Sequence, residues 1–242
     1  MPTDLSIEEY IARQPDYDKR RRMLLPLLRA AVPAFCEVKV EGLENVPRHG
    51  SASLMINHTS YLDPIVVTAS IPFRYTISLS KIENFRIPVV GWFLRQWGHF
   101  PIRRGDYDRK ALMQTIALLQ SGQLLLMAPE GTRHAGGLQP GKDGLAFVAT
   151  KSDTIIVPTA ICGAEDWKSR MKRLRRAYAK VVFGKGFRFR TAGQKRLPRR
   201  VLSQMIDEAM YQLAATIPDD YAHLRGHYAQ LEKATADYLE FL

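Results

Sequence analysis

The stretch "SLMINHTSYLDPIVV" (residues 53–67) joins a strand pattern, a polar loop and the start of a helix. Its apolar run ends at Ile56, and Asp63 followed by Pro64 is the order typical of a helix N-cap and first turn. His58 lies in the loop between them. Because a loop can fold back, we expect the His58 imidazole to contact the Asp63 carboxylate and so form a general base. The alternative is that Asp63 only caps its helix and His58 is an ordinary loop histidine.

Strand and helix patterns alternate along most of the chain. Strands are expected over 35–41, 51–57, 74–79, 98–102, 123–127, 154–161 and 179–190, and helices over 5–34 (with breaks at Pro15 and Pro33), 63–71, 87–96, 106–121, 141–151, 198–216 and 219–240. This alternation predicts an α/β fold with a mostly parallel sheet flanked by helices. Ligands of such sheets bind where strands end, which points to the loops after residues 56, 102 and 127.

The charge of the chain is strongly positive. Lys and Arg number 35 against 24 Asp and Glu, which gives a formal net charge of +11. Fourteen Lys or Arg and no acidic residue fall within 168–200, so we expect one basic face there. Such a face suits a polyanionic partner: nucleic acid, an anionic membrane surface or a phosphorylated substrate.

The N-terminal region combines charge with an apolar run. Residues 1–14 are polar and acidic, unlike a signal peptide. "KRRR" (19–22) precedes "MLLPLLRAAVPAFC" (23–36), which is too short and too interrupted by Arg29 and prolines to cross a bilayer. We expect either a helical segment lying on a membrane surface or an ordinary helix packed on the domain.

Two further loops carry groups suited to a phosphate. "GHFPIRRG" (98–105) ends in paired arginines, and "APEGTRH" (128–134) contains a carboxylate, a glycine and an arginine. The planar fork of arginine matches phosphate oxygens, and a loop glycine lets backbone N–H groups approach an anion. No Gly-x-Ser-x-Gly motif is present, so we expect direct transfer by a base and no covalent intermediate. No metal-ligand spacing is present either, and no metal is expected.

The chain resembles the glycerolipid acyltransferases, in particular the lysophosphatidic acid acyltransferase branch. "NHTSYLD" (57–63) is similar to the NHxxxxD motif of that family, and three further motifs follow in order. They are "GHFPIRR" (98–104), "PEGTR" (129–133) and "IIVPTAICG" (155–163), and the resemblance covers roughly residues 38–165.

The resemblance implies a glycerolphosphate acyltransferase-like fold. Together with the charge pattern, it divides the chain into an N-terminal membrane-associating segment over 1–36 and an acyltransferase domain over 37–242. That domain has its motif core at 38–165, the basic face at 168–200 and C-terminal helices. The expected position is the cytoplasmic face of a membrane, held peripherally or monotopically.

The implied reaction transfers a fatty acyl group to the sn-2 hydroxyl of lysophosphatidic acid, giving phosphatidic acid. The donor is acyl-CoA or acyl carrier protein, with no cofactor. His58 is expected to remove the hydroxyl proton and Asp63 to orient His58. The expected substrate-binding residues are Lys81, Arg104, Glu130, Gly131, Thr132 and Arg133.

Two alternatives stay open at this point. The acceptor could be glycerol 3-phosphate, a lyso-ornithine lipid or another lysolipid. From a different class, the chain could be a non-catalytic basic module that binds lipid or nucleic acid, although no platform of interleaved aromatic and basic residues is evident, and nucleic acid is not an expected partner. Trp92, Phe93 and Trp97 are candidates either for an acyl-chain groove or for plain core.

Overall fold

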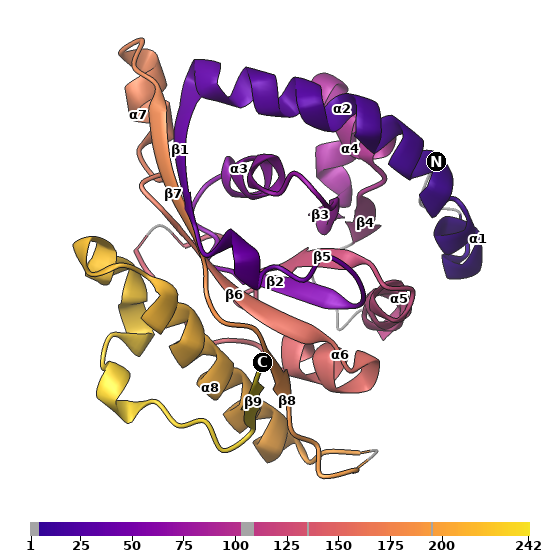
Figure 1. Ribbon diagram of the computed structural model, residues 1–242, viewed down its shortest axis with the longest axis vertical. Helices are drawn as coiled ribbons and strands as arrows, with labels where there is room; N and C mark the ends of the chain where they lie inside the picture. The colour runs from indigo at the N-terminus through magenta and orange to yellow at the C-terminus, as the bar shows by residue number, and fades with distance from the viewer. Residues whose placement is uncertain (1–4, 103–108, 135, 195) are drawn as a thin grey trace.

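The computed structural model describes residues 5–102, 109–134, 136–194 and 196–242, and it is a layered α/β fold (Figure 1). The strands are β1 (Cys36–Glu41), β2 (Ala52–Ile56), β3 (Thr76–Lys81), β4 (Phe100–Ile102), β5 (Leu124–Met127), β6 (Ile155–Cys162), β7 (Ala177–Phe183), β8 (Phe187–Phe189) and β9 (Leu239–Phe241). The helices are α1 (Ile7–Ala12), α2 (Gln14–Phe35), α3 (Asp63–Ser70), α4 (Pro88–Trp97), α5 (Arg109–Gln120), α6 (Gly144–Ser152), α7 (Trp167–Lys172) and α8 (Arg199–Thr216).

The described strands form one sheet in the order β1-β7-β6-β2-β5-β3-β4, with β8 beside β6 and β9 beside β8. β2 runs parallel to both of its neighbours, with Met55 opposite Met127 on β5 and Pro158 on β6. β6 and β7 are antiparallel. The strands β2 to β6 all run the same way, so their carboxyl ends share one edge. The predicted mostly parallel sheet flanked by helices is confirmed.

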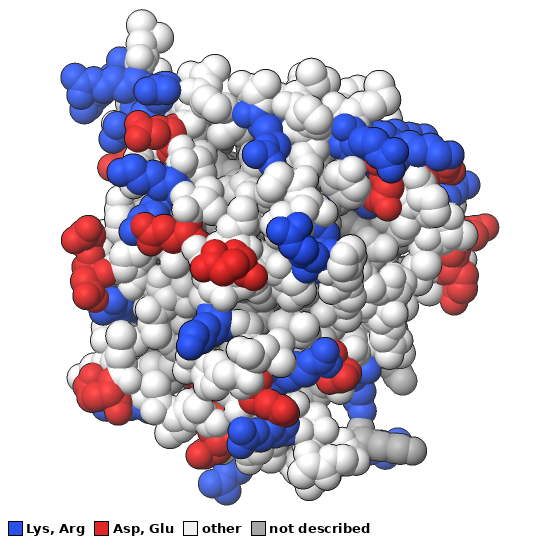
Figure 2. All heavy atoms as spheres, viewed as in Figure 1, with Lys and Arg blue, Asp and Glu red and all other residues white. Residues whose placement is uncertain are grey.

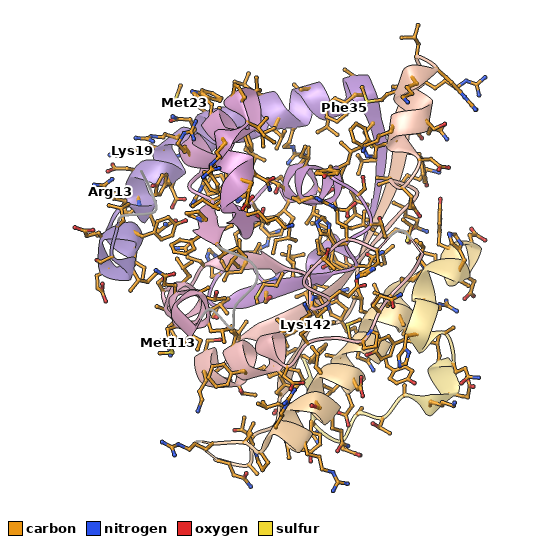
Figure 3. All side chains as sticks on the ribbon, turned by 180° about the vertical axis from the view of Figure 1, so that it is seen from behind. Arg13, Lys19, Met23, Phe35, Met113 and Lys142 are labelled. Carbon is orange, nitrogen blue, oxygen red and sulfur yellow. The ribbon has the colours of Figure 1, made fainter. Side chains whose placement is uncertain are left out.

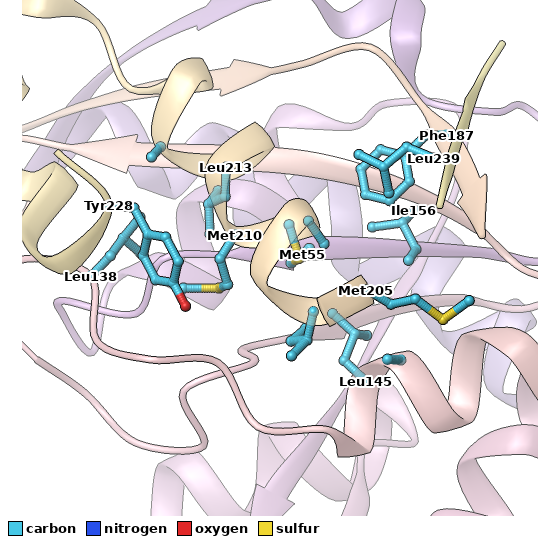
Figure 4. Packing of buried hydrophobic residues seen from close by; sticks show 14 of the residues in the cluster. Met55, Leu138, Leu145, Ile156, Phe187, Met205, Met210, Leu213, Tyr228 and Leu239 are labelled. Atoms are coloured by element: carbon cyan, nitrogen blue, oxygen red, sulfur yellow. The ribbon is translucent and has the colours of Figure 1, made fainter. Parts of the chain in front are cut away.

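Helices cover both faces of this sheet, which explains why its central strands are apolar throughout. Successive side chains of a strand point to opposite faces. Met55 and Ile156 pack against α6 and α8, where Met205 and Met210 meet them (Figure 4). Their neighbours Leu54 and Val157 join a second cluster with α2 and α3 on the other face.

The N-terminal helices dock on the end of α4. Arg21 of α2 is fully buried, and its Nε donates to the carbonyl of Trp97 at 2.6 Å. Its Nη1 pairs with Asp18 at 2.8 Å. The Tyr10 hydroxyl of α1 donates to the carbonyl of Gly98. The inner face of this region is therefore packed on the domain, as one of the two sequence readings expected.

The outer face of α2 is exposed and becomes largely apolar from Met23 onward, with Met23 and Leu27 exposed at 74% and 65%. The expected helix break at Pro33 is wrong, because α2 continues through Pro26 and Pro33 to Phe35. Proline has no N–H, so each one leaves the carbonyl four residues earlier without its helical donor. Both prolines are exposed, and water can donate to those carbonyls instead. In the described part of the chain, no helix is long and apolar enough to cross a bilayer.

The C-terminal part departs most from expectation. The stretch 179–190 is divided between β7 and β8, and 219–240 is not a helix but short 3-10 turns (Asp219–Tyr228 and Leu231–Lys233) followed by β9. The physical reason is pairing with Leu138, whose N–H donates to the Leu224 carbonyl at 2.9 Å and whose carbonyl accepts from His227 at 2.8 Å. These bonds hold the backbone of 224–227 in a loop.

The single basic face expected over 168–200 stays a prediction, and its residues extend from one end of the molecule to the other. α7 lies at one end of the molecule and the segment before α8 at the other, with β7 running between them (Figure 1). In Figure 2, Lys and Arg gather at the α7 corner and at the corner made by the first half of α2. Strands β7 and β8 run one after the other beside β6 between these two ends.

Gly91 of α4 packs closely against the backbone of Phe85, and mutation can test this contact. A Cβ on Gly91 would lie 2.2 Å from the backbone oxygen of Phe85, so Gly91→Ala should lower the free energy of unfolding by about 1–3 kcal/mol. Gly144→Ala in α6 meets its nearest atom at 3.8 Å and should be neutral or slightly stabilising. Urea unfolding of both variants checks this, and equal effects would contradict the packing described.

Candidate active site

The His58 and Asp63 side chains meet at the carboxyl end of β2. His58 Nδ1 lies 2.9 Å from Asp63 Oδ2, and the N–H groups of Thr59 and Ser60 donate to the same oxygen at 2.8 and 2.7 Å. Asp63 is fully buried, whereas 12% of the His58 side chain is exposed. The predicted contact is confirmed. Asp63 is the first residue of α3, not its N-cap, and its carboxylate turns back to the loop.

This geometry determines the tautomer of His58. An ionised carboxylate only accepts hydrogen bonds, so Nδ1 carries the proton and Nε2 keeps its lone pair. Nε2 bonds to no protein group in the part of the chain that the structure describes. Burial raises the pKa of Asp63, while the hydrogen bond and charge of His58 and the two backbone N–H groups lower it.

Asn57 attaches the start of this loop to the neighbouring strand. Its side-chain amide donates to the Ile161 carbonyl at 2.8 Å and accepts from the Ile161 N–H at 2.7 Å. Asn57 itself is buried. Because Ile161 belongs to β6, these side-chain bonds fasten the residue before His58 to the neighbouring strand just beyond the β2–β6 ladder.

The loop after β5 holds both backbone groups of His58. The buried Glu130 carboxylate accepts from the backbone N–H groups of Gln139, at 3.0 Å, and of His58. The N–H of His134 donates to the His58 carbonyl at 2.9 Å. Burial raises the pKa of Glu130 to about 7. Two of the three loops indicated by the sequence are thus joined directly to each other.

Gly131 forms the turn of this second loop. Its φ is +75°, which favours glycine, and its N–H donates to the Ala128 carbonyl at 3.0 Å. A Cβ at this position would lie 2.9 Å from Lys142 Nζ, so the absence of a side chain makes room for that amine. Thr132 is exposed. Sequence reasoning missed Lys142, which follows the loop without a recognisable motif.

Arg133 lies against an aromatic ring of the His58 loop. Its guanidinium carbon is 3.5 Å from the centroid of the Tyr61 ring, and Lys168 Nζ of α7 is 5.4 Å from the same centroid. Sequence reasoning named Arg133 but missed Tyr61 and the position of Lys168. The available signals were weak: Tyr61 is one of the unspecified positions of the NHxxxxD pattern, and Lys168 is the first of many basic residues.

The remaining predicted residues are more distant or not described. Lys81 is half-buried at the carboxyl end of β3, and no hydrogen bond or ion pair in the described chain joins it to the His58 loop. Arg104 lies outside the described residues. Trp97 is core: it is fully buried and its Nε1 donates to the Thr76 carbonyl at 2.8 Å. Phe93 stacks on Trp97, and Trp92 is 52% exposed.

Comparison with known proteins places this arrangement in a family. The family model described as Acyltransferase matches residues 37–162, more than half of the chain. The chain belongs to the acyltransferase family. The matched region contains His58, Asp63 and the 128–134 loop, and it ends with β6.

Several curated relatives carry the same name, 1-acyl-sn-glycerol-3-phosphate acyltransferase. One from Chlamydomonas reinhardtii is 29% identical over 216 residues, which are 84% of this chain and 61% of that protein. A chloroplastic one from Arabidopsis thaliana is 33% identical over 53% of this chain and 37% of its own length. One from Streptococcus pneumoniae is 29% identical over 50% and 46%. The matched regions therefore span less than two thirds of each relative.

A solved structure shares the fold. The 1-acyl-sn-glycerophosphate acyltransferase PlsC from Thermotoga maritima superposes with a TM-score of 0.60, at 22% identity, over 79% of this chain and 78% of that one. The mixed α/β arrangement with a mostly parallel sheet is common to both.

The raised pKa of Glu130 predicts a pH dependence of stability. Between its ordinary value of 4.5 and about 7, the folded state holds a proton that the unfolded state has lost. The stabilisation is complete at low pH and is lost as the pH rises through about 7. From about pH 5 to about pH 8, the wild-type protein should lose about 1–3 kcal/mol of unfolding free energy relative to Glu130→Gln.

Urea unfolding at the two pH values measures this difference. Glu44→Gln, which changes an exposed glutamate, serves as the control and should follow the wild-type protein at both values. A constant difference between Glu130→Gln and the wild-type protein across the range would show that Glu130 does not titrate there.

Proposed function

We propose that this protein transfers a fatty acyl group from acyl-CoA or acyl carrier protein to the sn-2 hydroxyl of lysophosphatidic acid, forming phosphatidic acid. The observation that carries the proposal is the His58–Asp63 pair, 2.9 Å apart, with Nε2 left without a protein partner in the described chain. Membership of the acyltransferase family supports the acyl-transfer reaction, and the names of the relatives support lysophosphatidic acid as the acceptor.

In this mechanism, His58 acts as the general base. Nε2 accepts the proton of the acceptor hydroxyl as its oxygen attacks the thioester carbonyl. The new C–O bond forms, the C–S bond of the tetrahedral intermediate breaks, and the leaving thiolate takes the proton from the imidazolium. Asp63 keeps Nδ1–H in place and stabilises the positive ring. General-base assistance contributes ~10²–10⁴-fold, and orienting two bound reactants contributes roughly 7–11 kcal/mol.

The two other loops serve binding in this proposal. Arg133 contacts the acceptor phosphate, and Arg104 and Lys81 are assigned to the same anion. Thr132 presents its backbone N–H to it, and Gly131, whose own N–H is bonded to Ala128, forms the turn that brings the loop close to the anion. Glu130 acts on substrate indirectly, because its carboxylate holds the His58 backbone. No residue is assigned to a metal or a cofactor.

Exposed apolar residues on two neighbouring helices support binding of the protein to a membrane surface. α2 and α4 lie side by side (Figure 1) and expose Met23, Leu27, Val89 and Trp92. Met23 projects outward from α2 in Figure 3. We therefore assign the protein to the cytoplasmic face of an anionic membrane as a peripheral or monotopic enzyme, where its lipid acceptor lies.

The proposal is tested with lysophosphatidic acid and a mixture of acyl-CoAs, with products identified by mass spectrometry. His58→Ala should lower kcat by ~10²–10⁴-fold, because the proton then has no acceptor. Asp63→Asn should also lower kcat, because the amide no longer favours the required tautomer. His49→Ala changes an exposed histidine and is the matched control, expected at the wild-type rate. Full activity of folded His58→Ala would refute the mechanism.

A further inference from the structure

One aromatic ring beside His58 contacts two cationic groups. The Arg133 guanidinium lies 3.5 Å above the centroid of Tyr61, and the Lys168 ammonium lies 5.4 Å from that centroid. Both distances fall within the range at which a ring attracts a cation. The three residues come from the loop after β2, the loop after β5 and α7.

Among the described residues, no acidic side chain pairs with either cation. Neither Arg133 nor Lys168 forms an ion pair within the described ranges, and Lys168 is exposed. Two like charges near one ring repel each other, and an anion bound to both would offset that repulsion. A phosphate monoester carries nearly two negative charges at neutral pH and therefore matches the pair.

The pair is also held beside the base. Tyr61 lies between His58 and Asp63, in the loop whose N–H groups bind the Asp63 carboxylate. His134, next to Arg133, donates its N–H to the His58 carbonyl at 2.9 Å. A phosphate bound by both cations would thus lie near the imidazole.

We infer that Tyr61 positions Arg133 and Lys168 as a two-cation clamp for the phosphate of the acceptor. This rests on the proposed function for the identity of the acceptor. Lys168 is then a substrate-binding residue, and Tyr61 is a positioning residue. The clamp makes acceptor affinity depend on a ring that carries no charge.

The first test is binding of a short-chain lysophosphatidic acid, below its micelle concentration and without an acyl donor, measured by calorimetry. Tyr61→Leu and Lys168→Met should each raise Kd roughly tenfold. Tyr61→Phe keeps the ring and should stay within about twofold. Lys172→Met removes a similar exposed charge from the same helix and is the matched control, expected to bind like the wild-type protein.

The second test is kinetic. In acyl transfer, Tyr61→Leu should raise KM for lysophosphatidic acid and leave kcat at saturating lysophosphatidic acid within about twofold of the wild-type protein. Unchanged Kd in both Tyr61→Leu and Lys168→Met, or an equal loss in Lys172→Met, would overturn the clamp. If the wild-type protein binds lysophosphatidic acid without acylating it, the proposed reaction fails while the clamp stands.

A separate observation concerns the turn after α7. Leu174 is 98% exposed and has φ +53°, a left-handed conformation that is unfavourable for leucine. Met171 beside it is 44% exposed. The turn is nevertheless ordered: the N–H of Leu174 donates to the Met171 carbonyl at 3.0 Å, and Arg176 Nη1 donates to the Pro33 carbonyl of α2 at 3.3 Å.

The surroundings of Leu174 are basic. Residues 168–176 contain six Lys or Arg and no acidic residue, and every one of them is exposed. Long side chains extend outward from this end of the molecule, which adjoins the C-terminal half of α2 (Figure 3). An apolar tip ringed by cations matches an anionic lipid surface, where cations meet headgroups and the tip meets acyl chains.

We propose that the 171–174 tip inserts into an anionic bilayer as a contact additional to α2 and α4. The test is flotation with phosphatidylcholine vesicles, with and without phosphatidylglycerol. Leu174→Asp should weaken binding to the anionic vesicles roughly tenfold. Met113→Asp changes an exposed methionine of α5, away from this end (Figure 3), and should bind normally.

Leu174→Gly separates this role from a structural one. Glycine relieves the positive φ, so the variant should be at least as stable as the wild-type protein while binding anionic vesicles more weakly. Wild-type vesicle binding by both Leu174 variants, or an equal loss in Met113→Asp, would overturn the proposal. This test does not require acyl transfer.

Discussion

A single buried oxygen, Oδ2 of Asp63, organises the site. It accepts one hydrogen bond from the His58 ring and two from the backbone of the same loop. A fully buried carboxylate is costly unless it is well hydrogen-bonded. These three donors offset part of that cost, because the other oxygen, Oδ1, is buried without a hydrogen-bond partner in the described chain and burial still raises the pKa of Asp63. In this loop, the backbone N–H groups stabilise the carboxylate, and the carboxylate in turn orients the imidazole.

The surroundings of His58 reinforce this arrangement from two neighbouring strands. Asn57 attaches the loop to β6, and the loop after β5 binds the N–H and the carbonyl of His58. Both supports depend on parallel strands ending at one edge. Parallel pairing thus brings together groups as far as 104 residues apart in the chain, as for Asn57 and Ile161.

Much of this could be predicted from the sequence, because it depends on local patterns. Apolar strands alternating with amphipathic helices indicate the sheet, and the His58-to-Asp63 spacing in a strand-to-helix loop indicates their contact. Acyl transfer was indicated by the resemblance, and the catalytic roles of these residues remain predictions. Pairings between distant segments left no local signal: the Tyr61 ring contacting Lys168, Leu138 pairing with 224–227, and Arg21 buried against α4.

The two prolines of α2 limit how deeply this helix can enter a bilayer. Pro26 and Pro33 lie about two turns apart, so their rings occupy the same outer ridge of the helix. Each ring deprives the carbonyl four positions earlier, on Arg22 and Arg29, of its N–H donor. Hydrocarbon offers no replacement donor, but hydrated headgroups do. A bilayer that received this ridge would hold α2 in its polar interfacial zone and keep it out of the acyl-chain interior.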